Sequence, residues 1–479
     1  MFATPLDWVL NLLILQGLMG AFDTVYHHEL TVGLPQRPGA RKELTLHAVR
    51  ALLYGVVFAA LAHVGFHGLW VAAIAALVLV EVGLTLWDFV VEDNSRKLPS
   101  TERVLHTVLA INGGALFGLY AWQLADWASL PSALVSLDTG WRGCLLSLFA
   151  AGVALSGVRD ALAARKLGQA AATPNPFAGL PHQRVLVTGG TGFIGEALVS
   201  QLLAAGHNVT VLARDPLNAA YLFHGRARCV PALDQLHSAE QFDAIINLAG
   251  APVVGPRWSP QRKAQLLASR VGTTQALQAW LARATHKPAT WIQASAIGYY
   301  GVRPADELLH EDSRAGQGFM TELCARWEES AQPAQRQGLR LVTLRLGLVF
   351  GPGGALLPLL LPHRFGLGGR MGNGRQIMSW VHRDDVLGMI ARALGDGTMQ
   401  GTYNAVAPEA ISQADFAQTI GRLMHRPVFL HLPAAPLRLI MGEMAQLFFD
   451  GQRVVPHRLQ SHGYVFRHPT LAGALRALI

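Results

Sequence analysis

Five long runs of hydrophobic residues dominate the first third of the chain, at roughly residues 8–26, 47–66, 68–90, 105–125 and 142–160. Each run is close to the ~20 residues that a helix needs to cross the hydrocarbon core of a bilayer. The pattern therefore predicts a multi-pass α-helical membrane domain over residues 1–166. An alternative stays open: because only a short turn separates the second and third runs, one run would be a buried helix instead.

The positive charges between these runs predict an orientation. Lys and Arg follow the first, third and fifth runs and are absent from the other two connections; they are Arg37, Arg41, Lys42, Arg96, Lys97, Arg103, Arg159, Arg165 and Lys166. Cytoplasmic loops of membrane proteins collect Lys and Arg. We therefore predict a cell inner membrane protein with its N-terminus outside and everything after residue 160 in the cytoplasm.

A different pattern begins after residue 166. Residues 167–183 contain three prolines and two glycines without apolar periodicity, which predicts a linker. From Arg184 onward, short β-branched runs such as "RVLVTGG", "NVTVLAR", "AIINLAG" and "TWIQAS" alternate with stretches of helical periodicity. This alternation is typical of an α/β fold with a doubly wound parallel sheet.

Composition supports the prediction of a membrane domain and argues against a nucleic-acid-binding protein. The chain is 51% hydrophobic and only 15% charged, whereas about a quarter of a typical soluble chain is charged. The net charge of +8 fits cytoplasmic loops better than a nucleic-acid site, because no long basic run is present. Membrane lipid is an expected partner and nucleic acid is not. The three cysteines are widely spaced, so neither a disulfide framework nor a zinc ribbon is expected.

The segment "VTGGTGFIG" predicts a dinucleotide site. Gly189 allows a tight turn after a strand, Gly192 lets the backbone approach a pyrophosphate, and Gly195 allows close packing of helix and strand. Thr191, Phe193 and Ile194 complete the predicted contact segment. The alternative is a glycine-rich turn without a ligand.

The end of the second strand, "VLARDP", bears on the choice of cofactor. Arg214 is suited to pair with the 2′-phosphate of NADP, which favours that cofactor. Asp215 follows directly and keeps NAD open as an alternative, and Arg214 as a solvated loop charge is another.

Several further motifs together carry a family resemblance: "NLAG", "SAIGYYG", "EDSRAGQGFMTELCARWE", "RLGLVFGPGG", "WVHRDDV" and "GEMAQLFFDGQRVVPHRLQSHGYVFRHPTLAGAL". With the glycine-rich turn, they make residues 184–479 resemble extended short-chain dehydrogenases/reductases. More narrowly, this part resembles the atypical group called epimerase-family or sugar-nucleotide-epimerase-like proteins. The resemblance implies a Rossmann-type NAD(P)-binding domain over 184–405 and a small C-terminal α+β substrate lobe over 406–479. It does not extend over residues 1–165.

The resemblance also implies roles for individual residues. The adenine–ribose side would be lined by Leu248, Ala249 and Gly250, with Arg270 approaching the cofactor. Ser295 would lie beside the nicotinamide at the end of its strand, and Arg345 would help to close the far side. Independently, Ser295 is a hydroxyl at the carboxyl end of a parallel strand, where such folds bind ligands.

The acid–base pair of the wider superfamily, Tyr-x-x-x-Lys, is absent. None of the eight tyrosines has Lys four residues later. Phe319 and Leu323 stand at a plausible place for the pair, and neither can transfer a proton. Tyr299 or Tyr300 could supply a hydroxyl from the "GYYG" loop, so these two and Ser295 are the catalytic candidates; packing beside the cofactor is the alternative.

Acidic residues and histidines recur in the predicted membrane helices with a spacing of four. Such a spacing places the side chains on one helix face. The candidate ligands are Asp23, His27, His28, Glu43, His47, Asp88, Glu92, Glu102 and His106. Carboxylates and imidazoles from four helices can hold iron or manganese, so a di-iron or other metal site is one hypothesis. A haem or quinone pocket and purely structural polar contacts are the others.

These observations predict a membrane-anchored NAD(P)(H)-binding oxidoreductase or epimerase-like protein acting on a small or lipid-soluble substrate. Coupling to a metal in the helices extends this hypothesis. Two alternatives stay open. One is a nucleotide-sugar epimerase that the helices merely anchor. The other is a non-catalytic NADP-sensing or scaffold protein, allowed by the missing Tyr/Lys pair.

Overall fold

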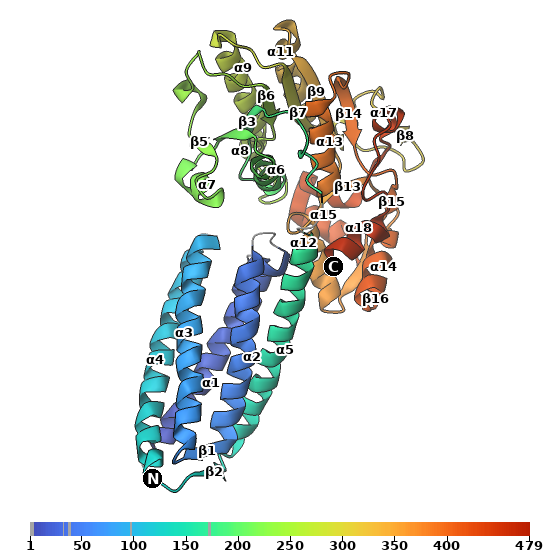
Figure 1. Cartoon of the computed structure of the whole chain (residues 1–479). Helices are drawn as coiled ribbons and strands as arrows, with labels where there is room; N and C mark the ends of the chain where they lie inside the picture. Colours follow the sequence, from blue (N-terminus) through green and yellow to red (C-terminus); the bar gives the residue numbers. More distant parts are fainter. Residues whose placement is uncertain (1–3, 32, 37–39, 96–97, 171–173) are drawn as a thin grey trace. The chain divides into compact units, whose positions relative to one another are not determined.

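The computed structural model of the chain describes residues 4–31, 33–36, 40–95, 98–170 and 174–479 (Figure 1). The chain divides into two compact units, Met1–Thr173 and Pro174–Ile479. We call them the helical unit and the cofactor unit.

The helical unit contains the five predicted helices. Its elements are α1 (Pro5–Phe22), the π-helix η1 (Asp23–Thr31), the 3-10 helix η2 (Leu34–Gln36), α2 (Arg41–His63), α3 (Trp70–Ser95), α4 (Ser100–Ala128) and α5 (Trp141–Ala170). Within the described residues, five helices are long and apolar enough to cross a membrane. Helix α2 runs beside α5, and α1 beside α4.

The helical unit is apolar inside and outside. Val9, Leu13 and Leu116 are fully buried in a core shared by several helices. On the outside, Leu79 and Leu155 are each 71% exposed, and many other large apolar side chains of the unit are exposed as well. A helix that is hydrophobic all round is typical of a bundle whose outer surface is not in water.

A pair of short strands was not predicted. Strands β1 (Val64–His67) and β2 (Ala133–Ser136) pair antiparallel, with Val64 opposite Ser136. They lie in the two connections that lack Lys and Arg. The second predicted span, 47–66, is therefore wrong at its end, because α2 stops at His63 and β1 follows.

The predicted linker, 167–183, is shorter in the structure. Helix α5 continues to Ala170, and residues 171–173 lie outside the described part of the chain. Phe177 is fully buried in the core of the cofactor unit, and Asn175 donates to the backbone oxygen of Gln201. The segment after Pro174 is therefore packed against the cofactor unit.

A seven-stranded parallel sheet forms the centre of the cofactor unit, in the order β14-β9-β7-β6-β3-β4-β5. Its strands are β3 (Arg184–Thr188), β4 (Asn208–Leu212), β5 (Arg228–Val230), β6 (Ala244–Asn247), β7 (Thr290–Ala296), β9 (Arg340–Leu346) and β14 (Gly401–Ala405). Val185 and Leu186 are both fully buried, in the cores on opposite faces. The predicted Rossmann-type sheet, buried on both faces, is confirmed.

Helices cover both faces of this sheet. They include α6 (Phe193–Ala204), α7 (Pro216–Leu222), η4 (Leu233–Gln235), α8 (Pro260–Leu267), η5 (Ala268–Gly272), α9 (Thr273–Arg283), η6 (Ile297–Tyr300), α10 (Phe319–Ala331), α11 (Pro333–Arg336) and α13 (Arg383–Gly395). Residues of α6 and α13 share one core, and those of α9 and α11 share the other.

The smaller lobe is not confined to residues 406–479. Three strand pairs join segments on both sides of that boundary: β8 (Leu308–Leu309) with β17 (Arg453–Val454), β11 (Gly368–Met371) with β16 (Val428–Leu432), and β12 (Ile377–Met378) with β15 (Ile411–Ser412). A fourth pair, β10 (Leu348–Phe350) with β13 (Trp380–His382), lies wholly before it. Its helices are α12 (Leu356–Arg364), α14 (Gln413–Met424), α15 (Ala434–Met441), η7 (Gly442–Ala445), α16 (Gln446–Phe449), α17 (His457–Ser461) and α18 (Leu471–Leu478). The smaller lobe is thus formed by two parts of the chain, one before and one after residue 406.

Candidate functional site

The turn between β3 and α6 needs glycine at two positions for steric reasons. Gly189 has a φ of +70°, and a Cβ there would lie 2.7 Å from the carbonyl carbon of Leu248. A Cβ on Gly195 would lie 2.1 Å from the Gly189 oxygen. The Gly192 amide donates to the Gly189 oxygen at 3.0 Å, and Gly192 is the N-cap of α6. The first amides of α6 therefore face the turn, where a phosphate would be stabilised.

The other predicted contact residues of the turn, Thr191, Phe193 and Ile194, differ in exposure. Thr191 is exposed, whereas Phe193 and Ile194 are half-buried. The Arg383 guanidinium lies 5.2 Å from the centre of the Phe193 ring, and a Cβ on Gly354 would lie within 2.7 Å of that ring. Phe193 therefore holds the turn against the strand–helix loop that follows β10.

At the end of β4, Arg214 and Asp215 differ in how their side chains are used. The Asp215 carboxylate accepts from the Asn218 amide at 3.0 Å and caps α7. Arg214 is exposed, and its side chain makes no hydrogen bond or ion pair with any described residue. The acid is therefore engaged locally, and the guanidinium remains accessible.

The loop after β6 lies against the glycine turn. Asn247 is fully buried and donates to Thr274 and Gln293 at 2.9 and 3.0 Å, which anchors the start of this loop. Leu248 contacts Gly189 directly, as the steric clash at that glycine shows. Thr274 and Gln293 were not predicted from the sequence, because their role depends on contacts between separate strands and helices.

Arg270 is held over the same loop by the π-helix η5. Its Nη2 donates to the Ala251 oxygen at 3.1 Å, and its guanidinium lies 2.9 Å from where a Cβ on Gly250 would stand. The ring of Trp327 is 5.1 Å from the guanidinium carbon. Burial lowers the pKa of Arg270, because the charged guanidinium is removed from water. The structure thus brings the glycine turn, the Leu248–Gly250 loop and Arg270 together.

Ser295 and Arg345 are joined through a residue to which the sequence assigned no role, Glu328 of α10. Ser295 donates to Glu328 Oε1 at 2.6 Å, and Arg345 binds both carboxylate oxygens at 2.9 Å. Burial lowers the pKa of Arg345, but the paired Glu328 carboxylate outweighs burial and the net pKa is raised. The guanidinium of Arg345 is therefore permanently charged, and the hydroxyl proton of Ser295 is used in the hydrogen bond to Glu328.

The two candidate tyrosines have different surroundings. The Tyr300 hydroxyl is buried, donates to Asn404 at 2.6 Å and accepts from Arg345 at 2.9 Å. Burial raises the pKa of Tyr300, so this hydroxyl is poorly suited to give up its proton. Tyr299 is half-buried, with the Arg345 guanidinium 3.5 Å from its ring centre. Its hydroxyl makes no hydrogen bond within the described chain, which leaves Tyr299 the more available of the two.

Helix α10 offers no acid–base pair at the place where Tyr and Lys were sought. Phe319 and Leu323 are buried in an apolar cluster with Trp258 and Met444. Cys324 lies beside Gly298, and burial raises the pKa of its thiol to about 12. The thiol is therefore neutral at physiological pH, and α10 contributes packing and Glu328 instead of a tunable base.

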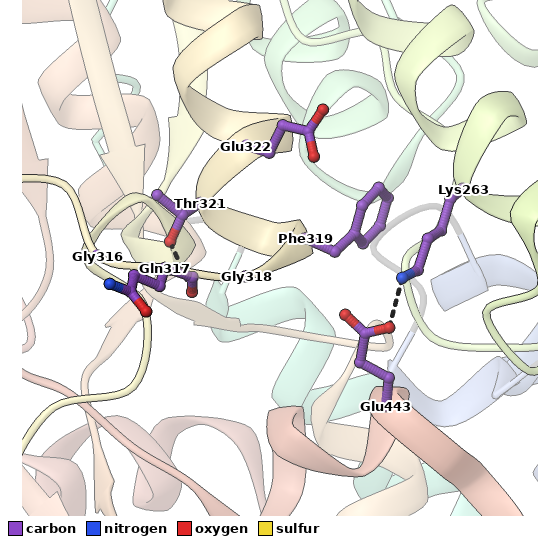
Figure 2. Close-up of a pocket in the computed structure, with 8 residues that line it drawn as sticks. All are labelled: Lys263, Gly316, Gln317, Gly318, Phe319, Thr321, Glu322 and Glu443. Atoms are coloured by element: carbon purple, nitrogen blue, oxygen red, sulfur yellow. Dashed lines mark hydrogen bonds and ion pairs between the residues drawn. The ribbon is translucent and has the colours of Figure 1, made fainter.

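A pocket of about 480 Å³ opens at the N-terminal end of α10 (Figure 2). Lys263 and Glu443 form an ion pair on one side of it, and the Lys263 ammonium lies 5.0 Å from the Phe319 ring centre. The lining residues are Lys263, Gly316, Gln317, Gly318, Phe319, Thr321, Glu322 and Glu443. The pocket thus combines one apolar ring with charges of both signs, and it draws on both the Rossmann fold and the smaller lobe.

In the helical unit, the predicted acid and histidine positions converge. Potential ligand atoms of Asp23, His28, Glu102 and His106 all lie within 4.8 Å of one another, as do those of His28, His47 and Glu92. The remaining predicted ligands, His27, Asp88 and Glu43, are in neither of these two sets. His27 contacts Asp23, Asp88 pairs with Arg50, and Glu43 is buried without joining either set.

Comparisons with known proteins agree with this geometry. Residues 185–405 match the NAD dependent epimerase/dehydratase family, and residues 432–478 match a domain of unknown function, DUF1731. The chain belongs to this epimerase family, as an atypical short-chain dehydrogenase/reductase, so the family predicted for residues 184–479 is confirmed and NAD(P) binding with it. The helical unit lies outside both matched ranges.

More narrowly, the chain is similar to proteins called epimerase family protein SDR39U1. The protein of Bos taurus is 38% identical over 304 residues, which cover 62% of this chain and 99% of the relative. YfhF of Bacillus subtilis (strain 168) is 35% identical over 299 residues, covering 62% and 97%. Human SDR39U1 (isoform 2), solved with NADPH, is 36% identical with a TM-score of 0.56, covering 62% of this chain and 98% of that one.

Proposed function

We propose that the protein is a membrane-anchored, NADP(H)-dependent oxidoreductase of the epimerase family that acts on a small or lipid-soluble substrate. One observation carries the cofactor preference: Arg214 is exposed and unengaged, while Asp215 caps α7. An NAD-selective site would offer its acid to the ribose hydroxyls, whereas an arginine accommodates the 2′-phosphate. The NADPH in the solved human relative supports this choice.

The residues of the site would share the work of holding this cofactor. The amides at the start of α6 would bind the pyrophosphate, and Arg270 with the Leu248–Gly250 loop would line the adenine–ribose side. When bound, NADPH supplies a hydride. Ser295, held by Glu328 at the end of β7, would position the reacting end, and Tyr299 would offer the free hydroxyl.

The substrate would enter the pocket at the N-terminal end of α10. This pocket carries the Phe319 ring for apolar contact and the Lys263–Glu443 pair for polar contact. Such a lining can contact an apolar part of a small substrate through Phe319 and its polar groups through the charged side chains.

The helical unit would anchor the protein in the cell inner membrane. Its support is the length of the five helices and the exposed apolar side chains around them. The distribution of Lys and Arg favours an external N-terminus and a cytoplasmic cofactor unit.

A second candidate is a non-catalytic NADP-sensing protein, and the burial of Phe319 and Leu323 favours it. NADPH oxidation separates the two functions. The full chain in mild detergent would be given NADPH and a total lipid extract of the inner membrane. Oxidation that Tyr299→Phe slows at least tenfold supports the oxidoreductase. If the protein binds NADPH but oxidises it neither with the lipid extract nor with nucleoside-diphosphate sugars, the result favours the NADP-sensing function.

The cofactor preference has its own test. Arg214→Ala should weaken NADPH binding about 10- to 100-fold, because one charged hydrogen-bond pair is lost, and leave NADH binding nearly unchanged. Arg226→Ala is the matched control, since Arg226 is another exposed arginine of the same unit. Titration of NADPH fluorescence would measure both. An unchanged ratio of the two affinities in Arg214→Ala would refute the role of Arg214.

A further inference from the structure

We propose that the helical unit binds a divalent first-row transition-metal ion through Asp23, His28, Glu102 and His106. His47 and Glu92 form the adjoining part of the same centre. This inference concerns the helical unit alone and does not depend on the function of the cofactor unit.

Four segments of the chain supply these side chains. Asp23 and His28 come from η1, His47 from α2, Glu92 from α3, and Glu102 with His106 from α4. Glu102 is 0% exposed and His28 is 8% exposed. Ionisable groups buried in an apolar bundle are costly, and in proteins they usually mark a functional site.

The distances between the potential ligand atoms suit a single ion. His28 Nε2 lies 3.3 Å from Asp23 Oδ2 and 3.6 Å from Glu102 Oε1. His106 Nε2 lies 3.1 Å from the same Asp23 oxygen. Ligands bound at about 2.0–2.2 Å around a tetrahedral or octahedral ion are roughly 3.0–3.6 Å apart. A metal ion would therefore fit with small side-chain movements.

The pitch of the π-helix η1 explains why His28, and not His27, is the ligand that we propose from this segment. A π-helix closes i→i+5 hydrogen bonds, so residues four and five positions apart both lie near one face. In an α-helix, His28 would point about 140° away from Asp23. Here His28 faces Asp23 and Glu102, whereas sequence spacing had favoured His27.

His27 supports the site from behind. Its Nδ1 is 2.8 Å from Asp23 Oδ1, whereas His28 is paired with the other oxygen, Oδ2; the Nε2 of His27 is 3.2 Å from the Thr101 hydroxyl. Similarly, His106 directs Nε2 toward Asp23 and Nδ1 toward Glu92, at 3.2 Å. A metal-bound histidine commonly has a carboxylate at its other ring nitrogen, which fixes the ring and its tautomer.

His47 provides an independent indication of a ligand. Its ring stacks on His28 with 4.7 Å between centres, and its Nε2 lies 3.2 Å from Asp88 Oδ2 and 3.4 Å from Glu92 Oε1. The residue is 8% exposed, yet its Nδ1 has no hydrogen-bond partner among the described residues. A buried polar atom of this kind usually has a partner outside the protein chain, such as water or an ion.

The neighbouring Arg50 corner shows what the same bundle does without a metal. Arg50 pairs with Asp88 and lies 4.0 Å from Glu81. An arginine stays protonated and cannot bind a metal, so this corner is a structural ion pair. The proposed centre instead combines two imidazole nitrogens with two carboxylates, a set that suits iron, manganese or zinc better than magnesium or calcium.

Metal analysis of the full chain tests the proposal. The protein would be purified in mild detergent without a histidine tag, and a second sample would be stripped with a chelator and titrated with Fe²⁺, Mn²⁺, Zn²⁺ or Co²⁺. We expect at least one tightly bound ion per chain. Glu102→Gln and His106→Ala should each reduce bound metal at least tenfold. The Co²⁺ form should show a visible spectrum that these variants lose.

Matched controls separate loss of ligands from loss of fold. His67→Ala and Asp126→Asn change a histidine and an acid of the helical unit outside the cluster, and they should retain the metal. Helical circular dichroism would confirm that each variant is folded. If a variant unfolds, the more conservative His28→Gln replaces it. The proposal is wrong if the folded wild type binds no metal in either preparation, or if folded ligand variants bind as much as the wild type.

Discussion

Each unit of this protein buries a network of ionisable side chains, and the two networks have different compositions. In the cofactor unit, Glu328 is bound at both oxygens by Arg345 and receives the Ser295 hydroxyl. In the helical unit, Asp23 and Glu102 face His28 instead. Arginine fixes a charge and offers no lone pair, whereas histidine can release its proton and bind a metal. The base that accompanies a buried acid thus separates a structural network from a candidate ligand site.

The largest effect is expected from Glu328→Gln. This change leaves the buried Arg345 charge without its carboxylate, which typically costs about 3–5 kcal/mol of stability. Denaturant unfolding of the cofactor unit, followed by tryptophan fluorescence, would measure it. Glu322→Gln is the control, because Glu322 is an exposed acid of the same helix. Equal stability of the two variants would show that the network is not structural.

Gly195→Ala should nearly abolish cofactor binding. The added Cβ would lie 2.1 Å from the Gly189 oxygen, so the turn would have to open. We expect NADPH affinity to fall by roughly 100-fold or more, since the pyrophosphate contacts depend on that turn. Gly272→Ala, where nothing lies within 4 Å of the added carbon, should bind NADPH normally.

Metal removal should affect the helical unit alone. A ligand at 100 times its Kd stabilises the folded state by about 2.7 kcal/mol. Chelation should therefore lower the thermal transition of the helices while NADPH affinity stays unchanged. A parallel loss of NADPH affinity would mean that the two units do not behave independently.

The smallest effect concerns the exposed ion pair of Arg184 and Asp243. The hydrogen bond from Arg184 holds the pKa of Asp243 below its usual 3.8. A lowered carboxyl pKa contributes stability above the unfolded-state pKa, and this contribution is lost as the pH falls through the folded-state pKa. Asp243→Asn should lower Tm by at most about 2 °C at pH 7, and the difference should shrink as the pH falls below 3.8 and disappear below the folded-state pKa. A difference that does not shrink on acidification would exclude the charge as its cause.

The features that were predictable from the sequence depend on local requirements. The turn at Gly189 and Gly195 needs glycine within a few residues of chain, and the five helices need only length and apolar composition. Glu328 was missed because its partner Ser295 is 33 residues away and lies on a different element. The smaller lobe was misplaced at residue 406 because its strands pair across that boundary.

The acid/histidine cluster is an intermediate case. The residue types and their spacing were visible, and the convergence of Asp23, Glu102 and His106 agrees with them. The choice between His27 and His28 depended on the pitch of η1, which an α-helical periodicity does not contain.

The pitch of η1 can also be regarded as a property separate from its sequence. If the nine residues of η1 adopted α-helical pitch, His28 would turn about 140° away from Asp23, while no histidine or carboxylate of the other helices changed. The bundle would then keep its fold and its apolar surface and lose the common face of its polar groups. The pitch of one short segment, and not the residue types alone, would thus decide whether these polar groups can act together.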